Sequence, residues 1–155
     1  MKVMILAVGR MKTGPEAALT RDWLARFEAT GRQLGLGPAT LVEVEDKRRR
    51  GADAEADLLL AAAPDGPLVA LDERGDALTS PAFAERLARM RDGGARSVAF
   101  AIGGADGHGA ALRARADWAL SFGPMVWPHM LARAMLAEQL YRAASILSGG
   151  PYHRA

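Results

Sequence analysis

The sequence predicts an α/β fold: a single domain in which a mostly parallel sheet carries helices on both faces. Short β-rich apolar runs alternate along the chain with stretches of helical periodicity, the pattern of repeated strand–helix–strand units. The 155 residues also fit one domain with one ordinary core, and no linker, internal repeat or low-complexity tract divides them.

Strands and helices are expected to alternate from the first residues onward. The predicted strands are Lys2–Val8, Thr40–Glu45, Pro67–Leu71, Ser97–Ile102 and a shorter one at Leu120–Phe122. The predicted helices are Glu16–Gln33, Asp53–Ala63, Ser80–Asp92, Ala110–Trp118 and a long final one at His129–Leu147. Proline at 81 and 128 stands where two of these helices begin, and the glycines at 149 and 150 close the last one.

Composition excludes several kinds of site. The chain has no Cys, which rules out disulfides, thiolate–metal sites and cysteine nucleophiles. His108, His129 and His153 lack the HxH and HxxxH spacings of metal ligands, so no metal is expected. The apolar run near the start is too short for a bilayer span and lacks a signal-type cleavage site. We therefore expect a cytoplasmic protein without membrane contact.

Positive charge is concentrated in two parts of the chain. The formal net charge is only +2, yet from Arg113 onward five Arg stand against Asp117 and Glu138 alone. The run Lys47–Arg50 forms a second basic spot. Such a run is either a solvated loop or a surface that binds a polyanion.

Three of the predicted strands end in unusual segments: Leu71–Gly75, Ile102–Gly109 and Phe122–Pro128. Ligands of open α/β sheets bind beyond the carboxyl ends of strands, so these segments predict one pocket in the second half of the chain. Two interpretations remain open for each segment. The first holds either paired acid–base carboxylates, Asp72 and Glu73, or a solvated turn. The second is either a ligand-binding loop or a tight turn, and the third is either a slot for an adenine ring or ordinary core. The G-x-G-x-x-G, P-loop and G-x-S-x-G motifs are absent.

The final helix and the tail carry the remaining signals. The apolar stripe of the helix is too wide for one core contact, which predicts a homodimer; it comprises Leu131, Met135, Leu136, Leu140, Ala143 and Leu147. Glu138 and Arg142 have the spacing of a helix-stabilising ion pair. The tail Tyr152-His153-Arg154 is either a frayed end or a group that stacks on a base, moves a proton and binds phosphate.

Together these segments resemble the small single-domain SPOUT methyltransferases of the RlmH type, which methylate N3 of a pseudouridine in large-subunit (23S) ribosomal RNA. The resemblance covers essentially the whole chain, and its most specific part is the set Pro128-His129, Arg133, Glu138, Tyr141-Arg142-Ala143 and Pro151-Tyr152-His153-Arg154. It implies a trefoil knot in about residues 70–155. It also implies a homodimer that acts on the assembled 70S ribosome, without a DNA partner.

The resemblance further implies that S-adenosyl-L-methionine is bound in the knot, mainly by backbone groups. The cofactor positions carried over are Leu71, Gly103, Phe122, Gly123, Pro124, Met125, Val126 and Trp127. Val126 stands where many members have Thr, so a hydroxyl hydrogen bond to the cofactor is absent while backbone recognition remains.

For catalysis, the tail is expected near the cofactor of the other subunit. His153 is the first candidate for the base that takes the N3 proton, and His129 the second. Arg154 and Arg142 would hold phosphate or stabilise negative charge on the uracil carbonyls, and Tyr152 would stack on the extruded base. Lys47–Arg50 would contact more distant RNA backbone. Two alternatives stay open: a SPOUT methyltransferase for another RNA, or a non-catalytic ribosome-binding α/β protein.

Overall fold

A computed structural model describes residues 1–153, in which five strands form one sheet in the order β2-β1-β4-β3-β5. The strands are β1 (Lys2–Val8), β2 (Ala39–Val44), β3 (Leu68–Ala77), β4 (Ser97–Ile102) and β5 (Trp118–Ser121). Every neighbouring pair is parallel, so the carboxyl ends of all five strands lie along the same edge. The predicted parallel α/β sheet is thus confirmed.

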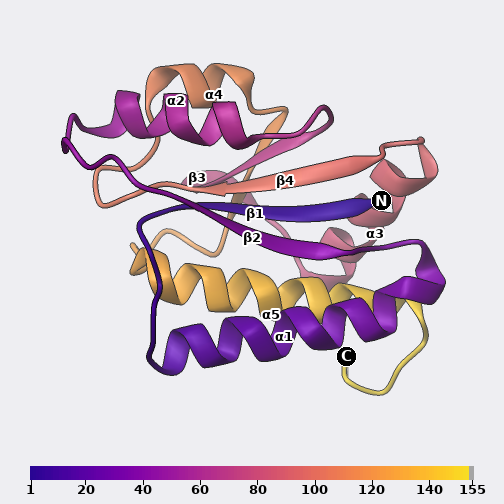
Figure 1. The fold of residues 1–155 in the computed structure, drawn as a ribbon. Helices are drawn as coiled ribbons and strands as arrows, with labels where there is room; N and C mark the ends of the chain where they lie inside the picture. Colours follow the sequence, from indigo (N-terminus) through magenta and orange to yellow (C-terminus); the bar gives the residue numbers. More distant parts are fainter. Residues whose placement is uncertain (154–155) are drawn as a thin grey trace.

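Helices cover both faces of this sheet (Figure 1). One face carries α1 (Pro15–Gly31), α3 (Ser80–Asp92) and α5 (His129–Leu147), and a short 3₁₀ turn, η1 (Arg32–Leu34), follows α1. The other face carries α2 (Ala52–Ala62) and α4 (Ala110–Arg115). Within each layer the helices pack on one another, α5 against both α1 and α3, and α2 against α4.

The core has two halves because side chains of a strand alternate between its two faces. In β4, Phe100 and Ile102 belong to the cluster that includes Phe27 of α1 and Leu136 of α5. Ala99 and Ala101 belong to the cluster on the other face, with Leu59 of α2 and Leu112 of α4. All residues of β4 are buried, as expected for a central strand covered on both sides.

The largest errors in the predicted boundaries lie around β3, α4 and β5. The helix predicted at Ala110–Trp118 ends at Arg115, because Asp117 bonds to both backbone groups of Leu68 at 2.8 Å and draws the chain into β5. The last strand therefore begins at Trp118 rather than Leu120. The strand predicted at Pro67–Leu71 runs on to Ala77.

The extension of β3 contains a bulge that matters for the site. Leu71 and Asp76 both pair with Leu120 of β5, so residues 72–75 have no partner in the ladder and form a bulge beside β5. Of the apolar stripe of α5, Leu136, Leu140 and Ala143 are buried, whereas Leu131, Met135 and Leu147 are only partly buried. Within residues 1–153, no helix has the length and apolar character needed to cross a bilayer. The trefoil knot stays a prediction.

Candidate functional site

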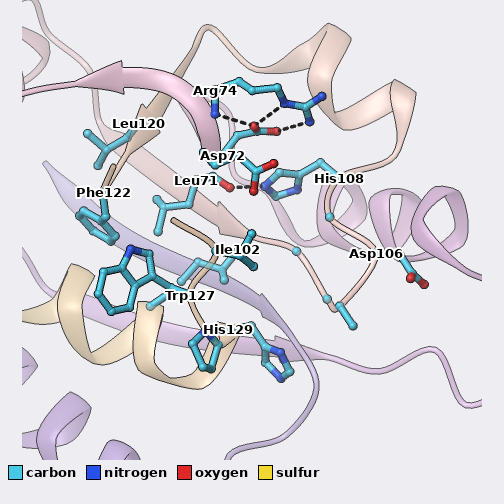
Figure 2. A pocket seen from close by; sticks show the side chains of 18 of the residues that line it. Leu71, Asp72, Arg74, Ile102, Asp106, His108, Leu120, Phe122, Trp127 and His129 are labelled. Carbon is cyan, nitrogen blue, oxygen red and sulfur yellow. Dashed lines mark hydrogen bonds and ion pairs between the residues drawn. The ribbon is translucent and has the colours of Figure 1, made fainter. Parts of the chain in front are cut away.

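A cavity of about 690 Å³ lies at the carboxyl ends of β3, β4 and β5 (Figure 2). Its walls come from the loops that follow these three strands and from the first turn of α5. The three segments singled out in the sequence therefore lie together at one edge of the sheet. The volume is within the range of small-molecule sites, about 300–1,000 Å³.

Seven of the eight residues expected to hold the cofactor line this cavity: Leu71, Gly103, Phe122, Gly123, Met125, Val126 and Trp127. Pro124 is not among the lining residues. Met125 and Val126 are 70% and 80% exposed, so they form the outer rim rather than the floor. Figure 2 shows Leu71 and Ile102 between the rings of Phe122 and Trp127 and the side chain of His108.

Two glycines are required by the shape of the loops. A Cβ atom at Gly103 would lie 2.7 Å from the carbonyl oxygen of Gly107, closer than real Cβ contacts allow. Gly123 has φ of 109°, a conformation that L side chains rarely adopt. Because neither position has a side chain, backbone groups of both loops are left open to the cavity.

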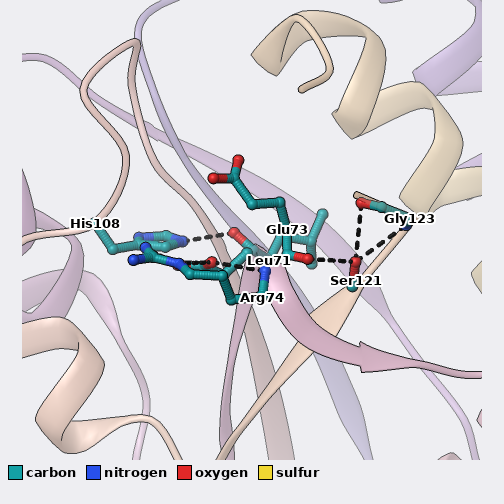
Figure 3. Close-up of polar contacts among 7 residues, drawn as sticks. Leu71, Glu73, Arg74, His108, Ser121 and Gly123 are labelled. Carbon is teal, nitrogen blue, oxygen red and sulfur yellow. Dashed lines mark hydrogen bonds and ion pairs between the residues drawn. The ribbon is translucent and has the colours of Figure 1, made fainter. Parts of the chain in front are cut away.

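His108 is a cavity residue that the sequence did not single out as a binding residue. Its Nε2 lies 2.8 Å from the carbonyl oxygen of Leu71 (Figure 3), and since a carbonyl only accepts, the proton is on Nε2. Its Nδ1 is buried and has no partner within residues 1–153. Burial lowers the pKa of His108, so the ring is neutral at physiological pH and ties the loop after β4 to Leu71 of β3.

Asp72 and Glu73 are not a catalytic carboxylate pair in this structure. The side chain of Arg74 binds both oxygens of Asp72, at 2.9 and 3.1 Å, and this contact lowers the pKa of Asp72.

The hydroxyl of Ser121 accepts the Gly123 N–H at 3.0 Å and lies 3.1 Å from the Glu73 carbonyl oxygen. As Figure 3 shows, these contacts tie two loops of the cavity together.

The lowered pKa of His108 predicts a pH effect on stability. Unfolding returns the imidazole to water, where its pKa is about 6.5. The unfolded chain therefore binds a proton more readily than the folded one, and stability falls as the pH drops below that value. His108→Gln keeps an N–H donor but does not titrate. We expect its melting temperature to fall less than that of the wild type between pH 7.5 and 5.5, as differential scanning fluorimetry would measure. An equal fall would contradict this assignment.

Arg133 joins the start of α5 to the sheet. It is completely buried, lies 2.8 Å from Oε1 of Glu43 on β2, and donates to the carbonyl of Val8 at the end of β1. Glu43 also accepts the Met11 N–H at 2.8 Å. This pair was missed in the sequence because Glu43 and Arg133 are 90 residues apart.

His129, one turn before Arg133, lines the cavity as the first residue of α5. Burial, and secondarily the charge of Arg133, lower the pKa of His129. The ring is therefore held neutral beside the cavity, which suits packing under a bound ligand.

Apart from His129, the residues expected to act in catalysis that the structure describes, Arg142, Tyr152 and His153, lie in a second cluster and do not line the cavity of the same chain. The tail folds back along α5, where the Tyr152 hydroxyl donates to Glu138 at 2.8 Å. Arg142 Nη1 lies 3.5 Å from His153 Nδ1. Arg154 lies outside the described residues. The Tyr152 ring packs against Tyr141 and Trp23 rather than standing free, and Trp23 gave no signal in the sequence.

An apolar groove of about 360 Å³ connects the two regions. It is lined by Leu19, Trp23, Phe122, Leu131, Ala134, Met135, Glu138 and Gln139. Phe122 also lines the cavity, while Trp23 and Glu138 also contact the tail cluster. Leu131 and Met135, from the apolar stripe of α5, thus face this groove instead of the core.

Comparison with known proteins assigns the class. The family model described as predicted SPOUT methyltransferase matches residues 1–153, and the chain belongs to this family of methyltransferases. SPOUT methyltransferases use S-adenosylmethionine. Among solved structures, the SpoU methyltransferase AviRb from Streptomyces viridochromogenes, in complex with AdoMet, is 15% identical with a TM-score of 0.46, over 96% of this chain and 59% of that one.

Several relatives are similar along their whole length. A protein of Ruegeria pomeroyi named ribosomal RNA large subunit methyltransferase H is 63% identical, over 99% of both chains. Proteins of the same name from Dinoroseobacter shibae and Cereibacter sphaeroides are 62% and 64% identical, again over 99% of each chain.

Proposed function

We propose that this protein transfers a methyl group from S-adenosylmethionine to N3 of a pseudouridine in large-subunit ribosomal RNA, within the assembled 70S ribosome. The cavity at the ends of β3, β4 and β5 carries the proposal, in a chain whose relatives bear the name of large-subunit ribosomal RNA methyltransferases. We further propose that residues 1–155 form one catalytic domain and that the protein acts in the cytoplasm. The knot and the cofactor site would lie in about residues 70–155.

The lining of the cavity fits S-adenosylmethionine. Leu71, Ile102 and Phe122 provide apolar surface for a purine ring, and the glycine positions leave backbone N–H and C=O groups accessible. Arg74, Asp72 and Arg113 provide charges of both signs for an amino-acid moiety. When bound, S-adenosylmethionine supplies an electrophilic methyl group. The walls then orient the reacting groups and exclude water.

In the proposed reaction the tail supplies the proton chemistry. His153 takes the N3 proton, which must leave before N3 becomes a good nucleophile, while Arg154 and Arg142 stabilise negative charge on the uracil carbonyls. Because Tyr141 and Trp23 pack against the Tyr152 ring, we assign Tyr152 to anchoring of the tail rather than to stacking on the base.

We propose a homodimer as the active form. The groove lined by Leu131 and Met135 is apolar and links the cavity to the tail cluster, so a second copy of the chain seated there would cover both. The tail of one subunit would thereby approach the cavity of its partner. Light scattering of the purified protein tests the dimer, and a Met135→Glu variant that stays dimeric would contradict this interface.

Two measurements test the function. Calorimetry with S-adenosylmethionine should show binding, which excludes a non-catalytic ribosome-binding protein. Labelled S-adenosylmethionine should then transfer its methyl group to ribosomes from cells that lack the modification, and not to free ribosomal RNA. Binding without transfer to these ribosomes would indicate a SPOUT methyltransferase for another RNA.

The basic loop between β2 and α2 predicts a salt effect on ribosome binding. Asp46, whose side chain is 3% exposed, accepts the backbone N–H groups of Arg48 and Arg50 and folds this loop. Lys47, Arg48 and Arg49 are left exposed, at the same sheet edge as the cavity. If they bind RNA phosphates, replacing all three with Ala should reduce the slope of log affinity against log salt by about 0.7–0.9 for each phosphate that is no longer bound.

The matched control removes three positive charges elsewhere. Lys2, Arg32 and Arg96 are exposed at or near the opposite, amino end of the sheet. Their replacement with Ala should leave the salt slope for ribosome binding unchanged. Equal slopes for the two triple variants would place the RNA contact elsewhere.

A further inference from the structure

We propose that Trp23 and Glu138 are positioning residues of the reaction: with Tyr141 they form a dock that holds the C-terminal tail and thereby places His153. This tail dock, defined as Trp23, Glu138 and Tyr141, combines residues of α1 and α5. The inference deepens the proposed function, because it requires that the tail carries part of the chemistry.

Glu138 is the polar half of the dock. One of its oxygens, Oε1, accepts the Tyr152 hydroxyl at 2.8 Å and Arg142 Nε at 3.0 Å. Its other oxygen, Oε2, accepts Gln139 Nε2 at 2.8 Å. Glu138 raises the pKa of Arg142, and burial followed by Glu138 raises that of Tyr152. The phenol therefore keeps its proton for this hydrogen bond at neutral pH, and the carboxylate does more than pair with Arg142 one turn away.

Trp23 and Tyr141 are the apolar half. The ring centroids of Tyr141 and Tyr152 are 4.7 Å apart, and Trp23 lies 5.7 Å from Tyr152. Trp23 also stacks on Tyr141, at 5.6 Å with 24° between the planes, while the guanidinium of Arg142 lies 4.7 Å from the Tyr152 centroid. Offset and tilted aromatic pairs at these separations attract one another beyond the area that they bury.

The dock determines where His153 lies. After α5 ends at Leu147, the backbone bonds from Gly149 to Ile146 and from Gly150 to Ser145 hold only the start of the tail. From there to the end of the described chain, the hydrogen bonds and aromatic contacts found are those of Tyr152 and His153 with Arg142 and the dock. Because His153 directly follows Tyr152, holding that ring limits the positions that the imidazole reaches.

Four variants test the proposal. Glu138→Gln removes the charge that binds Tyr152 and Arg142, Trp23→Ala removes the ring, and Trp23→Phe restores an aromatic surface. Arg26→Ala is the matched control, because Arg26 lies 4.8 Å over the Trp23 ring, while the hydrogen bonds and aromatic contacts of Tyr152 and His153 do not involve it. We expect Glu138→Gln and Trp23→Ala to lower the single-turnover rate on saturating ribosomes by about 10- to 100-fold, as for misplaced catalytic groups. Trp23→Phe should recover most of the rate, and Arg26→Ala should keep it.

For a positioning role, we expect the same variants to keep the cofactor affinity, the ribosome affinity and the dimer mass of the wild type. A rate loss matched by loss of cofactor binding or of the dimer would overturn the positioning role. Binding of the tail to the dock can also be measured independently of activity, by nuclear Overhauser effects between the Tyr152 ring and the Trp23 indole. We expect Glu138→Gln to remove these effects. Their absence in the wild type would overturn the dock whatever the reaction is. Their presence in a wild type that transfers no methyl group would instead reject the proposed function and with it the catalytic purpose of the dock.

Discussion

Replacing His153 with Ala is expected to lower the rate of methyl transfer by about 10²- to 10⁴-fold at saturating cofactor and ribosome, the usual contribution of a general base. The N3–H of the target is an imide-like proton, and the proposed role of His153 is to accept it. The rate is measured in single turnovers with labelled S-adenosylmethionine. Cofactor affinity should change far less than the rate, because the proposed contact of His153 is with the N3 proton of the target and not with the cofactor.

The pH dependence separates a base from a mere contact. An imide ionises without help at high pH, so the deficit of His153→Ala should shrink as the pH rises. A deficit that is constant with pH would contradict the role of His153 as the base. His129→Gln provides the comparison: it changes the imidazole beside the cavity, and we expect it to weaken cofactor binding rather than to alter the pH profile.

Replacing Arg133 with Met is expected to destabilise the fold by about 3–5 kcal/mol, the cost of leaving one partner of a buried ion pair without its counter-charge. Glu43, whose side chain is 23% exposed, would then lack its ion pair, and the carbonyl of Val8 would lose a donor. For a chain of this size, 1 kcal/mol of stability shifts the melting temperature by about 2–4 °C. The expected loss therefore lowers the melting temperature of Arg133→Met by roughly 6–20 °C.

Two further variants make this stability prediction specific. Removing both charges, with Glu43→Gln and Arg133→Met together, should restore part of the loss, because no unpaired buried charge remains. Arg115→Met breaks a surface ion pair with Asp117, in which the two side chains are 46% and 53% exposed. Its loss should lower the stability of the fold by less than about 1 kcal/mol. Equal melting temperatures for Arg133→Met and the wild type would show that the buried pair does not stabilise the fold.

The sequence predicted the sheet and the location of the cavity well because both follow from local patterns. The boundaries of β1, β4, α3 and α5 agree with the prediction residue for residue. The three glycine-bearing strand ends lie together because the carboxyl ends of parallel strands share an edge.

What the sequence could not predict depends on contacts between distant residues. The end of α4 is set by Asp117 binding Leu68, 49 residues away, which no local pattern reveals. Trp23 gave no signal, because an aromatic residue on a helix is usually core, and only the fold brings it to Tyr152. The ion pair of Glu138 and Arg142 was recognised from its spacing, but its contact with the tail required the chain to fold back.

The most direct measurement of the central claim is nucleoside analysis of the methylated ribosome. Ribosomes that lack the modification are incubated with the protein and labelled S-adenosylmethionine, and the large-subunit RNA is then digested and analysed by mass spectrometry. We predict a single labelled nucleoside, pseudouridine methylated at N3, and no label in ribosomes that lack the pseudouridine. Label on another nucleoside, or equal label without the pseudouridine, would contradict the proposed function.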